Sequence, residues 1–197
     1  SMRNSGIEVL LRYRVIADND FKLSVFGNLA YNKNEIIELA GQTEMRLGST
    51  QIHYAGDMAY QYYAAPYVGV NRANGEMLFL DINGNLTETP TDDDRRRLGK
   101  SPIPVYSGGF GLNADYKGFF MDVNFVFFAD VWKLDNNLFW YYNPSYAVDS
   151  NVSSDLLNAW TPDNLSGFPS LTANNTGLDN EFSDRYFSDA SYLRLRN

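Results

Sequence analysis

Two stretches of alternating apolar and polar residues constrain the fold of this chain more than any other feature. They occupy residues 106–116 and 119–128, and Lys117-Gly118 between them is typical of a tight hairpin turn. Strands of this length with one apolar face suit a transmembrane β-barrel, because lipid requires an apolar surface and complete backbone pairing. A soluble sandwich also alternates, but its strands usually span about 5–6 residues. The pattern predicts a lipid-facing set, which is Phe110, Leu112, Phe119, Met121, Val123, Phe125 and Phe127, and a lumen-facing set, which is Asn113, Asp115, Asp122 and Asn124.

A second alternating hairpin precedes the first and turns at residues 17–20. The connections on the other side are very long, about 37–102 and 133–190. Compact soluble domains rarely have such connections, whereas outer-membrane barrels combine short periplasmic turns with long extracellular loops. We therefore expect both turns to face the periplasm and both loops to face outward. The predicted strands are about 7–16, 21–36, 103–116, 119–132 and 191–197, and a small hairpin is expected near 67–81.

Five strands do not close a barrel, since small closed barrels need about eight. The fold prediction is all-β: residues 1–197 form part of one large antiparallel transmembrane β-barrel domain.

Composition agrees with this prediction and excludes several function classes. The chain has 14 Tyr and 13 Phe, which fits aromatic girdles at two membrane interfaces. No run of 18 apolar residues predicts a transmembrane helix, and the opening residues lack a signal-peptide pattern. A net charge of −8 argues against nucleic-acid binding, and the absence of cysteine excludes disulfides and thiolate metal sites. With a single histidine, His53, and no nucleophile–base arrangement, we expect no enzymatic activity.

A series of short motifs extends along nearly the whole chain. They are MRNSGIEV, GNLAYNKNEIIEL, YVGVNRANGEMLFLDINGN, DDDRRRLGKSPIPVYSGGFGLNADYKGFFMDVNF, WTPDN and SDRYFSDASYLRLRN. In their order and spacing they resemble the carboxy-terminal barrel region of SusC/RagA-type TonB-dependent outer-membrane transporters. The plug domain, the TonB-contacting segment, the early barrel strands and the final strand of that family have no counterpart here.

The resemblance implies a bacterial outer-membrane location and active import of a bulky nutrient, either a glycan fragment or an oligopeptide. It implies energy from TonB acting on a plug domain absent from this chain, and a SusD-like surface lipoprotein that covers the outer loops. Two alternatives stay open: a structural barrel subunit of an outer-membrane assembly without transport, and a soluble sugar-binding β-sandwich.

Two further residue sets are candidate sites. Asp81, Asn83, Asn85 and Asp92 have the spacing of positions 1, 3, 5 and 12 of a calcium loop, and calcium is the one cofactor considered. Leu86 stands where such a loop needs glycine, so a plain turn at Asn83-Gly84 is the alternative. Exposed aromatic side chains can stack on sugars or anchor a partner, or else pack within a loop or a girdle. The residues considered for ligand or partner contact are Trp132, Trp140, Tyr141, Tyr142, Tyr146 and Trp160.

Overall fold

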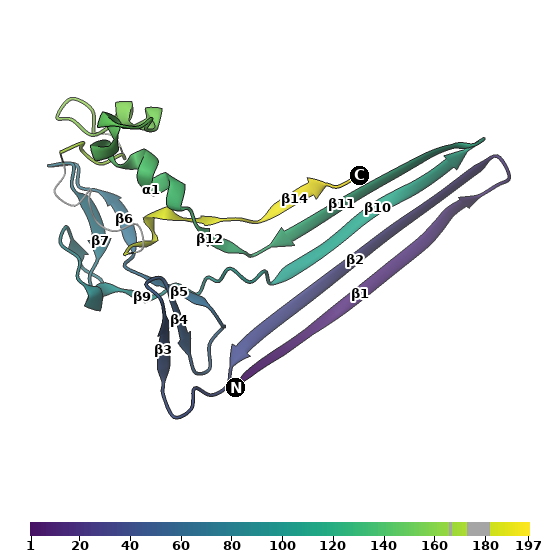
Figure 1. Cartoon of the computed structure of the whole chain (residues 1–197), viewed down its shortest axis with the longest axis horizontal. Helices are drawn as coiled ribbons and strands as arrows, with labels where there is room; N and C mark the ends of the chain where they lie inside the picture. Colours follow the sequence, from purple (N-terminus) through teal and green to yellow (C-terminus); the bar gives the residue numbers. More distant parts are fainter. Residues whose placement is uncertain (166, 173–181) are drawn as a thin grey trace.

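The computed structural model describes residues 1–165, 167–172 and 182–197. Its main feature is a five-stranded antiparallel sheet in the order β1-β2-β10-β11-β14. These strands are β1 (Met2–Ala17), β2 (Phe21–Ile36), β10 (Tyr106–Tyr116), β11 (Phe119–Ala129) and β14 (Tyr192–Leu195). Figure 1 shows them as a curved ladder, with β1 at one edge and β14 at the other.

Several strand ends differ from the sequence-based bounds. β1 begins five residues earlier than expected, at Met2, because the pairing with β2 continues as far as Ile36. β11 ends at Ala129 rather than 132, since Asp130 adopts a positive φ of 54° that breaks the strand. Trp132 belongs instead to a separate short strand, β12 (Trp132–Leu134), so the second outer segment starts at Asp130. β10 begins at Tyr106 rather than 103, and β14 spans only 192–195 of the expected 191–197.

The first outer segment, residues 37–105, folds into two small antiparallel sheets. One has the order β3-β4-β5-β9 and the other β6-β7-β8. Their strands are β3 (Glu44–Leu47), β4 (Gln51–Tyr54), β5 (Gln61–Ala64), β6 (Tyr67–Val70), β7 (Met77–Leu80), β8 (Leu86–Thr87) and β9 (Arg96–Arg97), with a 3-10 turn η1 (Asp92–Asp94). The β6–β7 pair forms the hairpin expected near 67–81.

The second outer segment contains a short helix that the sequence pattern did not predict. α1 (Asn136–Tyr142) begins after Asp135, whose side chain accepts hydrogen bonds from the N–H groups of Asn137 and Leu138. The other elements are η2 (Pro144–Val148), η3 (Ser154–Asn158), η4 (Asp184–Tyr186) and β13 (Phe187–Asp189), which pairs with β12. Residues 166 and 173–181 of the predicted loop 133–190 lie outside the described residues.

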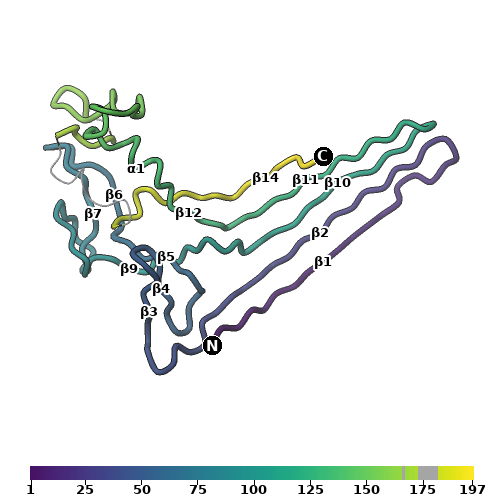
Figure 2. Tube along the Cα trace, in the orientation of Figure 1, coloured from purple at the N-terminus to yellow at the C-terminus, as the bar shows by residue number. Residues whose placement is uncertain are grey.

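The two ends of the main sheet are unequal. Both outer segments gather at one end, and the turns after β1 and β10 lie at the other (Figures 1 and 2). The buried core lies among the outer segments, where Ala65, Met77 and Phe79 pack with Tyr67 and Phe182. No helix among the described residues is long and apolar enough to cross a membrane.

Candidate functional site: the faces of the sheet and the outer segments

The register divides the main sheet into an apolar face and a polar face. Phe110 of β10 lies opposite Phe125 of β11, and their rings stack at 5.2 Å. Leu112 likewise pairs with Val25 on one side and Val123 on the other. Many of these apolar side chains are exposed: Leu11 retains 70% of its accessible surface and Ile7 retains 67%. An apolar surface of this extent marks a contact with lipid or protein.

Aromatic pairs lie near both ends of the apolar face. Tyr31 and Tyr106 meet at 5.4 Å near the outer segments, and Phe21 and Tyr116 meet at 6.1 Å near the turns. Tyr116 lies ten positions after Tyr106 along β10. At about 3.3 Å per residue and a tilt of roughly 40°, they are about 25 Å apart in height, which matches the apolar band of an outer-membrane barrel.

The four residues predicted to face the lumen lie together on the polar face. Asn113 pairs with Asp122, Gly111 pairs with Asn124, and Asp115 lies opposite Lys22 of β2. The same register adds four arginines that the sequence analysis did not single out. The arginines on this face are Arg12, Arg14, Arg194 and Arg196. Alternation already placed Arg12 and Arg14 there, whereas the last two required the pairing of β14.

Glycines on β10 leave room for rings from the neighbouring strands. A Cβ on Gly111 would lie 2.7 Å from the Phe26 ring and against the Val123 carbonyl oxygen. A Cβ on Gly108, on the opposite face, would lie 2.9 Å from the Phe127 ring. Both distances are too short for real side chains, so these positions need glycine.

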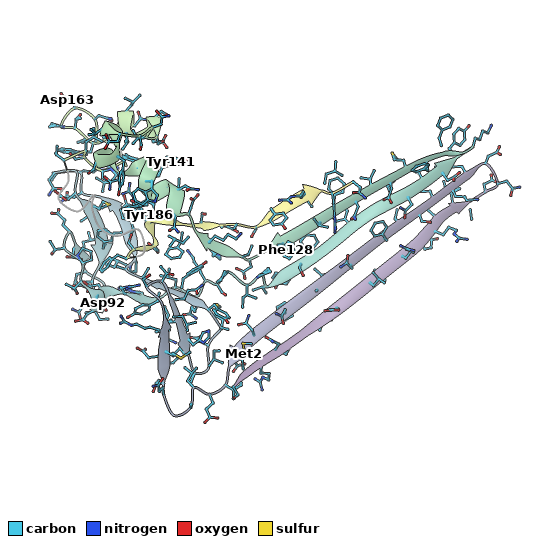
Figure 3. All side chains as sticks on the ribbon, viewed as in Figure 1. Met2, Asp92, Phe128, Tyr141, Asp163 and Tyr186 are labelled. Carbon is cyan, nitrogen blue, oxygen red and sulfur yellow. The ribbon has the colours of Figure 1, made fainter. Side chains whose placement is uncertain are left out.

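Arg185 joins the two outer segments. Its guanidinium lies over the rings of Tyr67 and Phe168, both at 5.4 Å, and its Nη1 donates to the Tyr186 hydroxyl at 3.2 Å. The same nitrogen lies 3.0 Å from the sulfur of Met77. Figure 3 shows Tyr141 and Tyr186 in this region, at the end of the molecule away from the short turns. Sequence reasoning missed Arg185, because nothing local distinguishes it from other loop arginines.

Asp184 adds a partly buried carboxyl group to the same junction. Its Oδ1 accepts a hydrogen bond from the Tyr67 N–H at 2.7 Å. Burial raises the pKa of the Asp184 carboxyl above its usual value, and the Tyr67 N–H and the charge of Lys100 only partly offset this effect. We therefore expect contact between the two outer segments to depend on the protonation of Asp184.

Most of the six aromatic candidates have internal partners. The indole N–H of Trp160 donates to the Arg72 carbonyl at 3.0 Å, and the Tyr142 hydroxyl donates to Asp155 at 3.0 Å. The Lys100 ammonium lies 3.7 Å from the ring centre of Trp132. Trp140 packs on Tyr146 at 4.4 Å. Trp140 and Tyr141 nevertheless remain about half-exposed, so these two are best placed to meet a ligand or partner.

The calcium-spaced residues do not converge as the spacing suggests. Asp81 accepts hydrogen bonds from the backbone N–H groups of Asn83 and Asn85, which lower its pKa and complete an ordinary turn. Asp92 instead pairs with Arg46 at 2.8 Å and Arg95 at 3.1 Å, and Arg46 is the larger cause of its lowered pKa. Asp94, rather than Asp92, contacts the turn: its Oδ1 accepts a hydrogen bond from the Ile82 N–H at 2.8 Å.

Among the described residues, no group of three or more His, Cys, Asp or Glu side chains could hold a metal ion. Asn side chains and backbone carbonyls fall outside that set, so calcium binding at the turn stays a prediction.

No protein-family model matches the chain. It is 29% identical over its whole length to TonB-dependent receptor P3 of Formosa agariphila and 24% identical to TonB-dependent receptor P39 of the same organism. It spans about a fifth of each relative: 21% of the first and 23% of the second.

Solved structures contain the same arrangement of strands. The RagAB peptide transporter matches 98% of the chain with a TM-score of 0.87 at 27% identity, and the match covers 22% of that protein. The open-open state of the RagAB peptide importer gives a TM-score of 0.88 at 28% identity, covering 98% of this chain and 21% of the other. In sequence and fold the chain is similar to a segment of SusC/RagA-type TonB-dependent receptors.

The outer-membrane location and the all-β, antiparallel barrel fold expected from the sequence are confirmed. The β-sandwich alternative does not fit, because the four long strands and β14 form one sheet with an exposed apolar face. The relatives and structural neighbours are receptors and transporters rather than enzymes.

Proposed function

We propose that the protein containing this receptor segment imports a bulky nutrient, an oligopeptide or a glycan fragment, across the outer membrane. The observation that carries the proposal is the two-faced sheet, together with its match to the barrel of a peptide importer at a TM-score of 0.87. In this proposal the apolar face contacts lipid. The polar face, with Asn113, Asp115, Asp122 and Asn124, lines the lumen.

Energy for import would come from TonB, acting through a plug domain encoded elsewhere in the protein. A structural neighbour named as a peptide transporter favours an oligopeptide over a glycan fragment. The barrel segment itself supplies wall and outer loops, so its residues act by binding and guiding the nutrient.

A SusD-like lipoprotein would cover the outer segments. Supporting this partner, the second outer segment exposes isolated apolar side chains: Val148 retains 85% of its accessible surface and Leu157 retains 88%. Trp140 and Tyr141 lie half-exposed on α1 in the same segment. Exposed aromatic groups such as these are enriched in protein–protein contacts, whereas a single exposed aliphatic side chain is ordinary.

Transport and partner binding can be tested separately. Deleting the gene in its host should abolish growth on, or uptake of, a set of oligopeptides or oligosaccharides while the outer membrane stays intact. Unchanged uptake of every compound would contradict import and favour the structural-subunit alternative.

Gentle detergent extraction of the intact protein should recover a surface lipoprotein, and replacing Trp140 and Tyr141 with alanine should reduce its recovery. Recovery of the receptor alone from wild-type cells would contradict the lipoprotein partner.

A further inference from the structure

Four arginines lie on the polar face, in pairs at opposite edges of the described sheet. Arg12 and Arg14 belong to β1, and Arg194 belongs to β14. The Arg196 N–H donates to the Asn124 carbonyl at 2.7 Å, which places Arg196 in the same cross-strand row as Asn124. From Asn124 on β11 the row continues through Gly111 on β10 and Phe26 on β2. It ends at Arg12 on β1, at the far edge of the sheet.

These arginines are not neutralised within the described part of the chain. None of the four has a carboxylate at ion-pair distance among the described residues. Arg12 lies over the Phe26 ring at 5.8 Å and Arg194 over the Tyr192 ring at 5.2 Å. Stacking on a ring orients a guanidinium but uses none of its N–H donors.

The surface between the two pairs is hollowed. Gly109 contributes to its floor, because it has no side chain. A hollow of about 650 Å³ includes Asn28, Asn124, Arg194 and Arg196 among its lining residues. A second hollow of about 350 Å³ is lined by Arg12, Arg14, Ser24 and Asn113. Volumes of this size suit part of a small ligand.

The charge of this face differs in sign from that of the chain. Lys22 joins the four arginines on it, opposed by three acidic side chains, whereas the whole chain has a net charge of −8. The acidic side chains on the face are Glu8, Asp115 and Asp122. Of these, Asp115 lies opposite Lys22, away from the arginine pairs.

We propose that this arginine-flanked face binds oxyanion groups of the imported nutrient. The guanidinium fork matches a carboxylate or sulfate with two parallel hydrogen bonds. The oxyanions can come from the acidic side chains of an oligopeptide or from the uronate or sulfate groups of a glycan fragment. The inference rests on the proposed import function and adds to it a preference for anionic cargo.

The test uses the full-length receptor in its host, with uptake measured at concentrations below saturation. Two double variants, Arg12→Gln with Arg14→Gln and Arg194→Gln with Arg196→Gln, remove charge from each edge. Arg3→Gln is the matched control, since Arg3 lies on β1 but on the opposite face, where it pairs with Glu35. The probes are labelled peptides of equal length, one rich in Glu and one rich in Gln, together with oligogalacturonate and a neutral maltooligosaccharide.

Each double variant should lower uptake of an anionic probe about tenfold and leave its neutral counterpart within about twofold, since one lost charge-assisted contact corresponds to about a factor of ten. The peptide and glycan arms identify the source of the oxyanion. Equal loss for anionic and neutral probes would overturn the inference and indicate that the arginines hold another part of the receptor. Unchanged uptake of the anionic probes in both variants would also overturn it. So would a wild-type receptor that imports the neutral probes but not the anionic ones. Failure of the wild type to import any probe would overturn the import proposal itself.

Discussion

Single positions on β10 decide how closely neighbouring strands approach. Gly111 lies on the polar face beneath the Phe26 ring, whereas Gly27 on β2 has nothing nearer than 3.8 Å to its missing Cβ. The surrounding atoms therefore leave no room for a larger residue at Gly111, whereas they leave room for one at Gly27. Of these two, only Gly111 occupies a position where a methyl group would collide with a ring and a backbone carbonyl.

Replacing Gly111 with alanine should destabilise the barrel by about 1–3 kcal/mol, the usual cost of overpacking. Gly27→Ala should have little effect, because its new methyl group would meet ordinary van der Waals contacts. The measurement is the thermal unfolding temperature of the purified full-length receptor in detergent. Equal unfolding temperatures for the two variants would show that the Phe26 ring moves aside freely.

Val123 and Asn124 are neighbours on β11 with opposite orientations. Val123→Arg should cost roughly 2–4 kcal/mol because it places a charge near the middle of the apolar band. Asn124→Asp should be tolerated far better, since the polar face already holds Asp122 and Asp115. Folding free energies in lipid vesicles, or outer-membrane levels of each variant, give the comparison. A larger loss for Asn124→Asp would reverse the assignment of the two faces.

The main strands and the outer segments are stabilised by different interactions. The main strands are held by backbone pairing and expose side chains on both faces, so lipid and the remaining strands must complete their surroundings. The outer segments have their own buried core around Phe79 and are joined by Arg185 and Asp184. This junction is where pH should act.

Contact of η4 with β6 should weaken as pH rises. Burial raises the pKa of Asp184 in the folded segment, so the docked state binds more protons than the undocked state. Docking is therefore most stable below the ordinary pKa of the carboxyl and loses that stability as pH rises through the folded-state pKa. Asp184→Asn keeps an oxygen that can accept from the Tyr67 N–H and removes the ionisation.

Hydrogen exchange of residues 182–189 in the full-length receptor tests this expectation. At each pH the wild type is compared with Asp184→Asn, which cancels the pH dependence of chemical exchange. The ratio of wild-type to variant exchange should grow as the pH rises above the ordinary pKa of an aspartate, about 4. A ratio that stays constant as the pH rises would rule out Asp184 as the titrating group.

At the scale of the whole molecule, both outer segments lie at one end of the sheet and both short turns at the other (Figure 1). Barrels of this class place long loops outside the cell and short turns in the periplasm. The chain should therefore have a single orientation in the outer membrane.

Cysteine labelling on intact cells tests this orientation directly. An impermeant thiol reagent should modify cysteine substituted at Asp93 or Asn151, in the two outer segments, and spare cysteine at Asn19 or Lys117, beside the short turns. Labelling after the outer membrane is permeabilised should reach all four and serves as the control. The reverse pattern on intact cells would invert the assignment, and with it the proposed lipoprotein contact.

Much of the barrel segment was predictable because its pattern is local. Alternation at a period of two places Phe125 and Asn124 on opposite faces whatever their neighbours are, and Lys117-Gly118 specifies the turn. The bounds of β2 could be read in the same way. The end of β11 could not, because the positive φ of Asp130 depends on how the chain enters β12.

The sequence by itself therefore determined which side chains share a face of the sheet and which ends of the strands carry short turns. Only the tertiary structure decided which strands are neighbours. It paired β10 with β2 across the first outer segment and set Arg196 in line with Arg12. It also separated Asp92 from the turn at Asp81 and gathered aromatic rings around Arg185. These contacts join residues far apart in the chain, so they depend on non-local hydrogen bonding and packing that no short sequence period records.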